Sequence, residues 1–291
     1  MSSTIVSPPA DLTPQQMQRF SKLVYEKIGV TISPQKVTLL SNRLRRRLRS
    51  TGVANYDAYY DLLSSTSTDT AEWEAFLQEV TTHETYLFRD QAHWDWVRNV
   101  FLSDIQAQVR EGKRRPTLRI WSAACSTGDE ATSLACCVAD RLQPGGDWKI
   151  EILGTDVGSG AVAAANRGVF GERAMRLVPE SMRRRFFEYD AETREWTSRD
   201  VLRRMMKFRT HNLLKPLREA PFDLVLLKNV LIYFDTASKK QVVQELRRVV
   251  SPGGYLITGA AEGVADLIRD LNSTHGWLHR FPTAQKPGAA T

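Results

Sequence analysis

The sequence predicts an α/β protein with a mostly parallel sheet, helices on both of its faces, a small all-α N-terminal domain and a small inserted subdomain. Three observations predict this class. Over roughly the first 85 residues, apolar residues recur at helical spacing and no strand candidate occurs. From about residue 117, short apolar runs alternate with helical stretches. Residues 167–200, rich in Arg and Glu, interrupt that alternation.

Four helices are expected in the N-terminal domain, because helix-start residues precede each apolar stripe. Their expected first and last residues are Thr13 and Gly29, Ser33 and Gly52, Asn55 and Leu63, and Asp69 (with Glu72) and Val80. The expected divisions of the chain are an N-terminal domain at 12–84, a linker and connecting helix at 85–116, and an α/β domain at 117–285 with its insertion at about 167–208.

Charge is distributed unevenly in this N-terminal domain. Residues 12–50 hold nine basic residues and one acid, whereas residues 51–80 hold six acids and no Lys or Arg. One interpretation is two helix faces that complement each other. The other is a surface that docks an acidic partner, since the whole chain has a net charge of +7. The candidate docking residues are the five arginines around the Leu40-Leu44-Leu48 stripe, namely Arg43, Arg45, Arg46, Arg47 and Arg49.

Five strands and three helices are expected to build the α/β domain. The strands are expected at 118–123, 150–155, 201–208, 222–227 and 255–258, and the helices at 129–142, 159–166 and 236–250.

Composition excludes several classes of protein. With 42% hydrophobic and 25% charged residues, the chain is neither disordered nor fibrous as a whole. No apolar run approaches the length of a membrane helix, and residues 1–12 lack the features of a secretory signal. Three cysteines, two of them adjacent, form no disulfide framework, and the five histidines have no metal-ligand spacing. We expect a cytoplasmic monomer without a metal ion or direct membrane insertion.

The first strand-to-helix turn of the α/β domain, residues 121–130, is the candidate cofactor loop. It has small residues but only Gly128 of the G-x-G-x-x-G spacing, and Asp129 and Glu130 stand at the start of the helix. Two carboxylates there would repel a pyrophosphate and favour a cationic ligand such as S-adenosylmethionine. Helix capping by acidic residues is the alternative interpretation.

Two other strand ends carry candidate ligand residues. Asp156 ends the second strand, where a carboxylate can accept both ribose hydroxyl protons or can cap the next helix. Asn229 and Tyr233 follow the fourth strand, where they can contact the cofactor and line the reaction site, or can simply pack at the strand end.

Several segments, in order along residues 15–282, resemble the chemotaxis receptor methyltransferases, the CheR family. Residues 81–90 resemble its T-T-N-x-T-x-F-F-R-E segment, and residues 122–130 its S-A-A-x-S-T-G-E-E loop. Further matches are residues 154–156, the N-L-L element at 210–214, the R-N-V-x-I-Y-F strand end at 228–234, and the P-G-G-x-L and Glu262 segment from 252. The resemblance implies a Rossmann-like S-adenosylmethionine-dependent methyltransferase domain behind a small all-α N-terminal domain.

The resemblance also implies roles for individual residues. Tyr233 would lie beside the transferred methyl group. Arg89 could orient either a carboxylate or the cofactor if its side chain points inward, and a surface salt bridge is the alternative. The implied cofactor-binding residues are His83, Thr85, Arg89, Glu130, Asp156, Asn212, Leu213, Asn229 and Val230. This sequence departs from the family pattern at His83 (usually Asn), Ala131 and Thr132 (usually Pro-Tyr), Gly158 (usually acidic), Lys228 (usually Arg) and Ala261 (usually Ser).

The activity implied by the resemblance is methyl transfer from S-adenosylmethionine to glutamate carboxylates on the cytoplasmic helical region of methyl-accepting receptors, leaving S-adenosylhomocysteine. Some family members bind a receptor tail through a loop of the inserted subdomain. The segment 188–200 is short and lacks the glycines of such a loop, so we expect that this protein does not need a receptor-tail tether. One alternative is a non-catalytic module that binds the cofactor. The other is a nucleic-acid methyltransferase, which the absence of interleaved basic and aromatic residues disfavours.

Overall fold

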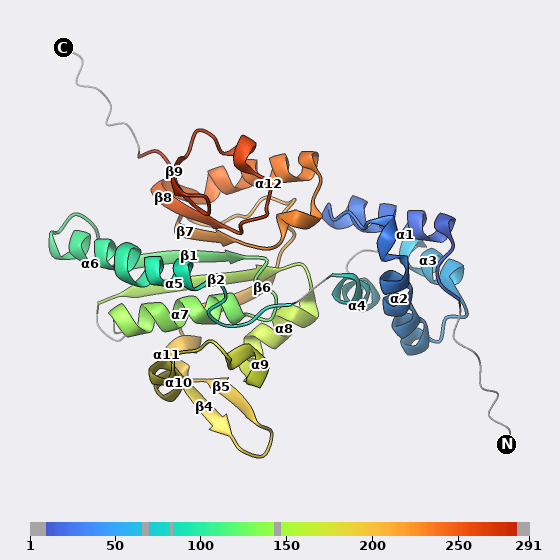
Figure 1. Cartoon of the computed structure of the whole chain (residues 1–291), viewed down its shortest axis with the longest axis horizontal. Coiled ribbons are helices and arrows are strands. Elements are labelled where there is room, and N and C mark those ends of the chain that lie inside the picture. Colours follow the sequence, from blue (N-terminus) through green and yellow to red (C-terminus); the bar gives the residue numbers. More distant parts are fainter. Residues whose placement is uncertain (1–9, 66–69, 82–83, 143–146, 284–291) are drawn as a thin grey trace, which may run out of the picture.

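The structure, a computed structural model, describes residues 10–65, 70–81, 84–142 and 147–283. A bundle of short helices stands at one end of the molecule and a larger α/β domain at the other (Figure 1). A small sheet projects from the α/β domain on the side away from α12 (Thr236–Val249). The predicted fold class is confirmed.

The helical domain contains the four predicted helices and a short 3-10 turn. They are α1 (Pro14–Ile28), η1 (Pro34–Lys36), α2 (Val37–Thr51), α3 (Tyr56–Ser65) and α4 (Ala71–Val80). Thr13 and Gln16 form the expected capping box of α1, and Gly29 ends the helix in the left-handed conformation. Thr70, not Glu72, caps α4 by accepting a hydrogen bond from the Trp73 amide. Asp69, the other predicted cap, lies outside the described residues.

The helix that connects the two domains is continuous. It runs through α5 (Gln91–Trp96), a π-helical turn η2 (Val97–Phe101) and α6 (Leu102–Arg110). Val97, Phe101 and Leu102 are buried and belong to the same hydrophobic core as α7 (Asp129–Leu142). The connecting helix and α7 therefore cover one face of the main sheet, while α12 packs on the other.

The main sheet has seven strands in the order β6-β2-β1-β7-β8-β10-β9. Its strands are β1 (Thr117–Ala123), β2 (Lys149–Asp156), β6 (Met206–Thr210), β7 (Phe222–Leu227), β8 (Val250–Thr258), β9 (Asn272–His275) and β10 (Leu278–Arg280). The pairs among β6, β2, β1, β7 and β8 are parallel, and β10 and β9 add an antiparallel edge. The carboxyl ends of β1 and β2 lie level because Ala123 pairs with Thr155.

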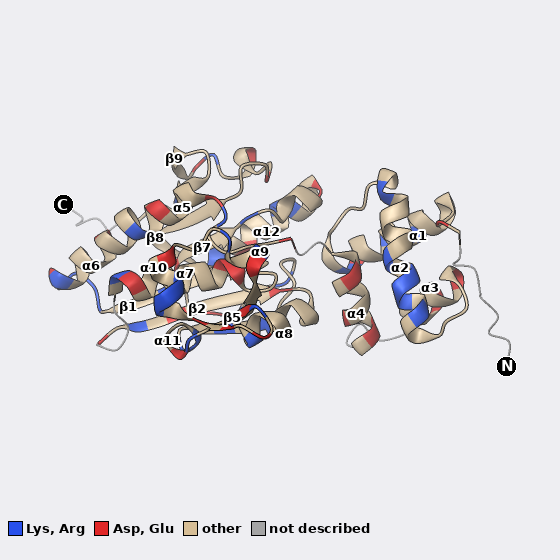
Figure 2. Ribbon diagram, turned by 60° about the horizontal axis from the view of Figure 1, so that its bottom comes forward, with Lys and Arg blue, Asp and Glu red and all other residues tan. Residues whose placement is uncertain are grey.

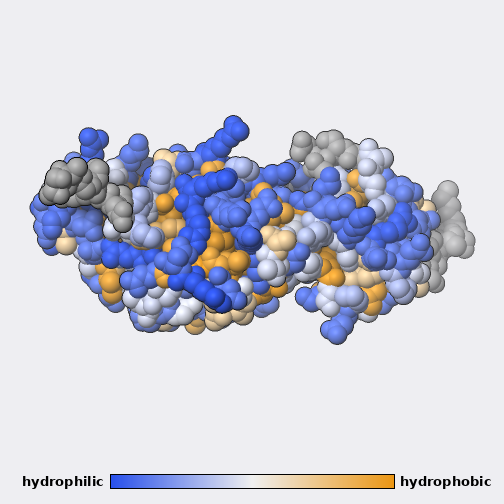
Figure 3. All heavy atoms as spheres, turned by 90° about the horizontal axis from the view of Figure 1, so that it is seen from above, coloured by the Kyte–Doolittle hydropathy of each residue, from blue (hydrophilic) through white to orange (hydrophobic). Residues whose placement is uncertain are grey.

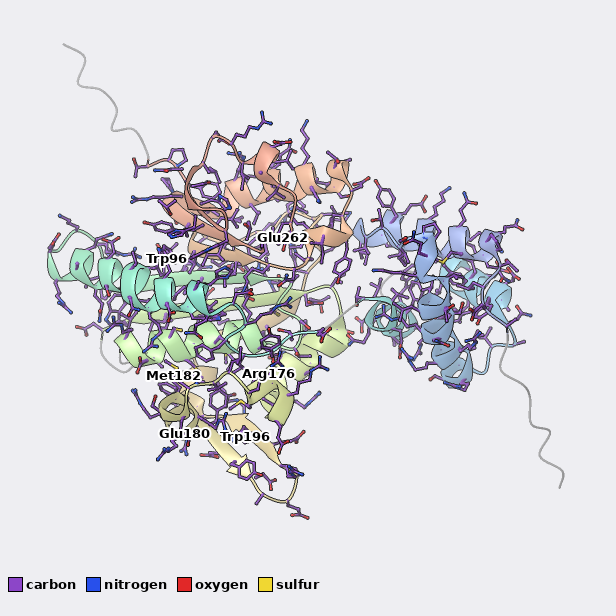
Figure 4. The ribbon with its side chains drawn as sticks, in the orientation of Figure 1. Trp96, Arg176, Glu180, Met182, Trp196 and Glu262 are labelled. Carbon is purple, nitrogen blue, oxygen red and sulfur yellow. The ribbon has the colours of Figure 1, made fainter. Side chains whose placement is uncertain are left out.

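The inserted segment forms a second sheet of three strands, in the order β3-β5-β4. Its elements are β3 (Val169–Gly171), α9 (Glu172–Met175), α10 (Glu180–Phe186), β4 (Phe187–Asp190), β5 (Glu195–Ser198) and α11 (Asp200–Arg203). Trp196 on β5 marks this unit below the main sheet (Figure 4). The helix α8 (Ser159–Arg167) precedes the insertion.

Two predictions about strands need correction. The strand expected at 201–208 is α11 followed by β6, because Leu202 is buried in the core beneath α7 rather than in the sheet. Periodicity does not distinguish a short buried helix from a strand. The strand β9 was not predicted, since all four of its residues are exposed and carry no apolar alternation. The strand β10 was not predicted either, and its three residues are too few to show a period.

The basic and acidic segments of the helical domain face each other on α2 and α4 (Figure 2). Arg46 pairs with Glu79 at 2.6 Å, and Arg47 holds both oxygens of Glu72 at 3.1 and 2.6 Å. Arg45 pairs with Asp11 at 2.7 Å. These contacts support the interpretation that complementary helix faces account for much of the charge asymmetry.

Replacing Arg47 with Met should destabilise the protein, because it leaves the half-buried Glu72 carboxylate without its cation. We expect a loss of about 2 kcal/mol in the free energy of unfolding, measured by urea denaturation. Arg49→Met on the same helix is the matched control, since Arg49 is exposed, and should change stability by less than about 0.5 kcal/mol. Equal losses in the two variants would contradict the structural role of the pair.

Candidate active site

A cleft lies between the helical domain and the carboxyl ends of the parallel strands. Of the residues predicted to bind a ligand, those that line it are Thr85, Arg89, Glu130, Asp156, Asn212, Leu213, Asn229, Val230 and Tyr233. Arg43 of the predicted docking set also lines it, whereas Arg45, Arg46, Arg47 and Arg49 do not. His83 lies outside the described residues. Positions distant in sequence therefore meet at one site.

Asp156 lies at the end of β2 and is only 6% exposed. Its two carboxylate oxygens accept hydrogen bonds from the backbone amides of Ser126, at 2.8 Å, and Gly158, at 2.9 Å. The carboxylate thus fixes the turn after β1 and the start of α8. It also borders the cleft at the position from which a carboxylate can bind ribose hydroxyls.

The turn after β1 lines the cleft with Ala124, Cys125 and Ser126 and has an unusual backbone conformation. Ala124 and Ser126 have positive φ values of 60° and 50°, and Gly128 has φ 88°. A Cβ on Gly128 would lie 2.8 Å from the Cβ of Ala165, so a larger residue would displace α8. The glycine therefore serves helix packing and the left-handed turn.

The two acidic residues at the start of α7 have different environments. Asp129 is buried, accepts a hydrogen bond from the Thr127 hydroxyl at 2.6 Å and does not line the cleft, so its carboxylate is engaged by the turn that precedes α7. Glu130 does line the cleft and accepts a hydrogen bond from Ser122 Oγ at 2.8 Å. Of the two carboxylates predicted to face a cationic ligand, only Glu130 lines the cleft.

Lys228 places a buried ammonium group beside Glu130. Its side chain is 2% exposed, and its Nζ lies 3.0 Å from Asp90 Oδ2 and 3.6 Å from Glu130 Oε2. The indole ring of Trp94 lies 5.3 Å from the same nitrogen. Sequence reasoning noted Lys228 only as a departure from a pattern. Its partner Asp90 is 138 residues away in sequence, so no local signal identified the pair.

Glu262 fixes the turn that carries Asn229. It is 1% exposed, and its carboxylate accepts hydrogen bonds from the amides of Asn229 and, at 2.7 Å, Leu231. Asn229 itself has φ 58°, and this turn leads into the 3-10 helix η3 (Leu231–Tyr233). Glu262 is labelled in Figure 4 within the larger domain. It is a positioning residue that the sequence interpretation left without a role.

The segment after α1 closes the cleft from the helical domain. Thr31 donates to the Tyr233 carbonyl through its amide, at 2.8 Å, and through its hydroxyl, at 3.0 Å. Asn212 Nδ2 donates to the Lys27 carbonyl at 2.7 Å, so this side chain joins the two domains as well as lining the cleft. The Lys36 ammonium lies 5.5 Å from the centre of the Tyr233 ring. In the space-filling view, apolar atoms are exposed on either side of the notch between the domains (Figure 3).

Four of the residues that depart from the family pattern, Ala131, Thr132, Gly158 and Ala261, do not border the cleft, whereas Lys228 does. Ala131 and Thr132 are buried in α7, where the Thr132 hydroxyl contacts Met206 Sδ at 3.8 Å. Gly158 contributes its backbone amide to Asp156. The departures at these positions therefore alter packing behind the site rather than groups that face a ligand.

The donor set of the cleft fits S-adenosylmethionine. Asp156 suits its ribose, the ionisable Glu130 suits a cationic group, and the wall includes small and apolar residues such as Ala124, Leu213 and Val230. The fold and this cleft define an S-adenosylmethionine-binding methyltransferase. The chain belongs to the CheR methyltransferase family: residues 15–81 match its all-alpha domain and residues 83–276 its SAM binding domain.

Curated relatives match over most of the chain. A chemotaxis protein methyltransferase of Escherichia coli is 31% identical over 263 residues, covering 89% of this chain and 87% of that protein. The Salmonella typhimurium chemotaxis protein methyltransferase is 28% identical over 266 residues, covering 90% and 88%. No helix in the described part of the chain is long and apolar enough to cross a bilayer. Within the described ranges, His, Cys, Asp and Glu side chains do not gather in threes as metal ligands would.

His93, behind the site, should make stability depend on pH. Burial, aided by the positive charge of Lys228, lowers the pKa of His93 from 6.5 to about 4. The unfolded chain therefore binds a proton near pH 6.5 that the folded protein binds only near pH 4. The contribution of His93 to the free energy of unfolding is therefore fully present above pH 6.5. It falls by up to about 3 kcal/mol as the pH is lowered to 4.

Urea denaturation at pH 7, 6 and 5 measures this contribution. As the pH is lowered, the free energy of unfolding should fall less in His93→Phe than in the wild type. The phenyl ring keeps the contact that His93 makes with Trp277, whose ring centre lies 4.3 Å away. Carboxyl groups contribute to both proteins, so the difference isolates His93. Parallel pH profiles would contradict the prediction.

Proposed function

We propose that this protein transfers a methyl group from S-adenosylmethionine to glutamate side chains of methyl-accepting chemotaxis receptors, forming glutamate methyl esters. One observation carries the proposal: Arg89 and Tyr233 line the same cleft as Asp156 and Glu130. Membership of the CheR family and the two chemotaxis relatives support the substrate class.

In this proposal, the α/β domain holds the cofactor through the strand-end residues. Asp156 accepts the ribose hydroxyls, and Glu130 accepts a cationic group of the methionine part. Thr85, Asn229 and Val230 border the remainder, with Leu213 as an apolar wall. The bound cofactor supplies a methyl group made electrophilic by its sulfonium sulfur. The turn at 124–126, with its positive φ values at Ala124 and Ser126, allows close approach of the backbone.

The residues on the other side of the cleft have to align the accepting carboxylate. A glutamate has an ordinary pKa near ~4.3, so at pH 7 it is already ionised and requires no general base. Arg89, Arg43 and Lys36 bring positive charge to the cleft, and Tyr233 lies beside Lys36. Alignment of two reactants can contribute about 7–11 kcal/mol to the acceleration. Positioning and exclusion of water are therefore the work of this chain's own residues.

Receptor docking through α2 remains part of the proposal in a narrower form. Arg46 and Arg49 are exposed, although Arg46 also pairs with Glu79. A glutamate of a Glu-rich receptor helix could replace Glu79 as the partner of Arg46, because an exposed ion pair contributes little stability. The chain would act as a monomer in the cytoplasm, where these receptor helices are located.

Asp156→Ala should weaken the binding of S-adenosylhomocysteine by about 100-fold, since hydrogen bonds to a charged acceptor contribute about 1.5–3 kcal/mol. Isothermal titration calorimetry measures this loss. Asp129→Asn is the matched control, because Asp129 is a nearby buried carboxylate that does not line the cleft. It should change affinity by less than about threefold. Retained affinity in Asp156→Ala would exclude the ribose assignment.

The activity itself is tested with cofactor labelled on the methyl group. Purified protein is incubated with membranes from its own organism, and the separated proteins are treated with alkali. We expect label on a membrane receptor that is released as volatile methanol, the signature of a carboxyl methyl ester.

Other outcomes of this assay would point elsewhere. Alkali-stable label, or label in nucleic acid alone, would contradict the proposed substrate. Cofactor binding without any transfer would favour a non-catalytic module. Arg46→Glu with Arg49→Glu should lower receptor labelling while leaving cofactor affinity unchanged, and unaltered labelling would exclude docking through α2.

A further inference from the structure

A buried cation with two carboxylate partners, Lys228, stands in the wall of the cleft. Lys228 Nζ contacts Asp90 at 3.0 Å, Glu130 at 3.6 Å and the Arg89 carbonyl at 3.4 Å. The Lys228 and Glu130 side chains are 2% and 15% exposed, whereas the Asp90 side chain is 42% exposed. Solvent can therefore reach Asp90, but Glu130 depends on protein groups for its ionisation.

The two oxygens of Glu130 have different neighbours. Oε1 accepts the hydrogen bond from Ser122, and Oε2 is the oxygen that faces Lys228. Burial raises the pKa of the Glu130 carboxyl, and the Lys228 charge and the Ser122 hydrogen bond oppose that rise. The ammonium group is thus the nearest cation that favours the ionised form of this side chain.

The charged and titratable groups around the cluster of Lys228, Asp90 and Glu130 come from several elements. They are Arg89 and Asp90 before α5, His93 on α5, Cys125 in the turn after β1, Asp129 on α7 itself, and Lys228 after β7. His93 is neutral at pH 7, since burial lowers its pKa to about 4, and burial raises the pKa of the Cys125 thiol. Lys228, Asp90 and Glu130 together leave one negative charge, which a cationic ligand group would neutralise.

We propose that Lys228 is a positioning residue that keeps Glu130 ionised in the cleft, so that the amino-acid end of the cofactor meets a fixed carboxylate at neutral pH. The inference rests on the role given to Glu130 in the proposed function. Lys228 lines the cleft as well, and in this inference it acts through Glu130, the carboxylate that its ammonium group faces. A compact ammonium suits this place because it fits between two carboxylates and the face of Trp94.

The experiment measures binding, not methyl transfer. Affinities for S-adenosylhomocysteine and for 5′-methylthioadenosine, which lacks the amino-acid end, are determined by calorimetry from pH 8 to pH 6. The proteins are wild type, Lys228→Met, Lys228→Arg, Glu130→Gln and the Lys228→Met/Glu130→Gln pair. Thermal melting of each protein controls for folding.

Wild-type affinity for S-adenosylhomocysteine should stay nearly constant over this range. In Lys228→Met, Glu130 becomes protonated as the pH is lowered, so affinity should fall by up to about tenfold per pH unit. In Lys228→Arg, which keeps the positive charge, the affinity for S-adenosylhomocysteine should again be nearly constant over this pH range. Methylthioadenosine binding should be equal in all variants, and Glu130→Gln should remove the pH effect of the Lys228 change.

Three results would overturn the inference. One is an equal loss for both ligands in Lys228→Met, which would mean a structural role alone. Another is a pH-dependent loss that persists in the double variant. The third is a wild-type affinity for S-adenosylhomocysteine that falls from pH 8 to pH 6, together with an affinity of Glu130→Gln that does not change with pH. This result would mean that Glu130 titrates even with Lys228 present, and it can be obtained whether or not the Lys228 variants fold. Since none of these measures methylation, a failure of receptor labelling would remain a separate result.

Discussion

The hydrogen bonds of Asp156 hold together the three chain segments on which the site depends. Its carboxylate accepts the amides of Ser126 and Gly158, and its backbone carbonyl accepts the amide of His211 at 2.8 Å. The turn after β1, the start of α8 and the segment after β6 are therefore fixed relative to one another. A buried carboxylate that satisfies two backbone donors also avoids the cost of leaving them unpaired.

The position of the helical domain follows from the segment that Asp156 holds. Asn212 comes next after His211 and donates to the Lys27 carbonyl at the end of α1. Val30 and Phe234 form an isolated antiparallel bridge, which extends the contact to the turn that contains Tyr233. The cleft is therefore a product of both domains. Neither the strand ends nor the helices would enclose a ligand alone.

Charge has two different uses in the molecule. On the surface of the helical domain, arginines of α2 pair with acids of α4 and the N-terminal segment, so much of the local charge is already matched. In the wall of the cleft, by contrast, the buried ammonium group of Lys228 faces two carboxylates. The first arrangement orients helices, and the second leaves a net negative charge where a cationic ligand group would bind.

The sequence by itself determined the fold class, the helix starts such as Thr13 and the strand at 222–227, because these depend on local periodicity and capping. Strand ends and the family resemblance together named ten candidate ligand residues, and the nine of them that the structure describes line the cleft. It did not separate α11 from β6, nor identify β9, whose exposed residues lack a pattern. Only the tertiary structure decided that Asp129 is buried against Thr127 while Glu130 faces the cleft, and that Lys228 meets Asp90. Those outcomes depend on burial and on contacts between residues far apart in the chain, which no local pattern encodes.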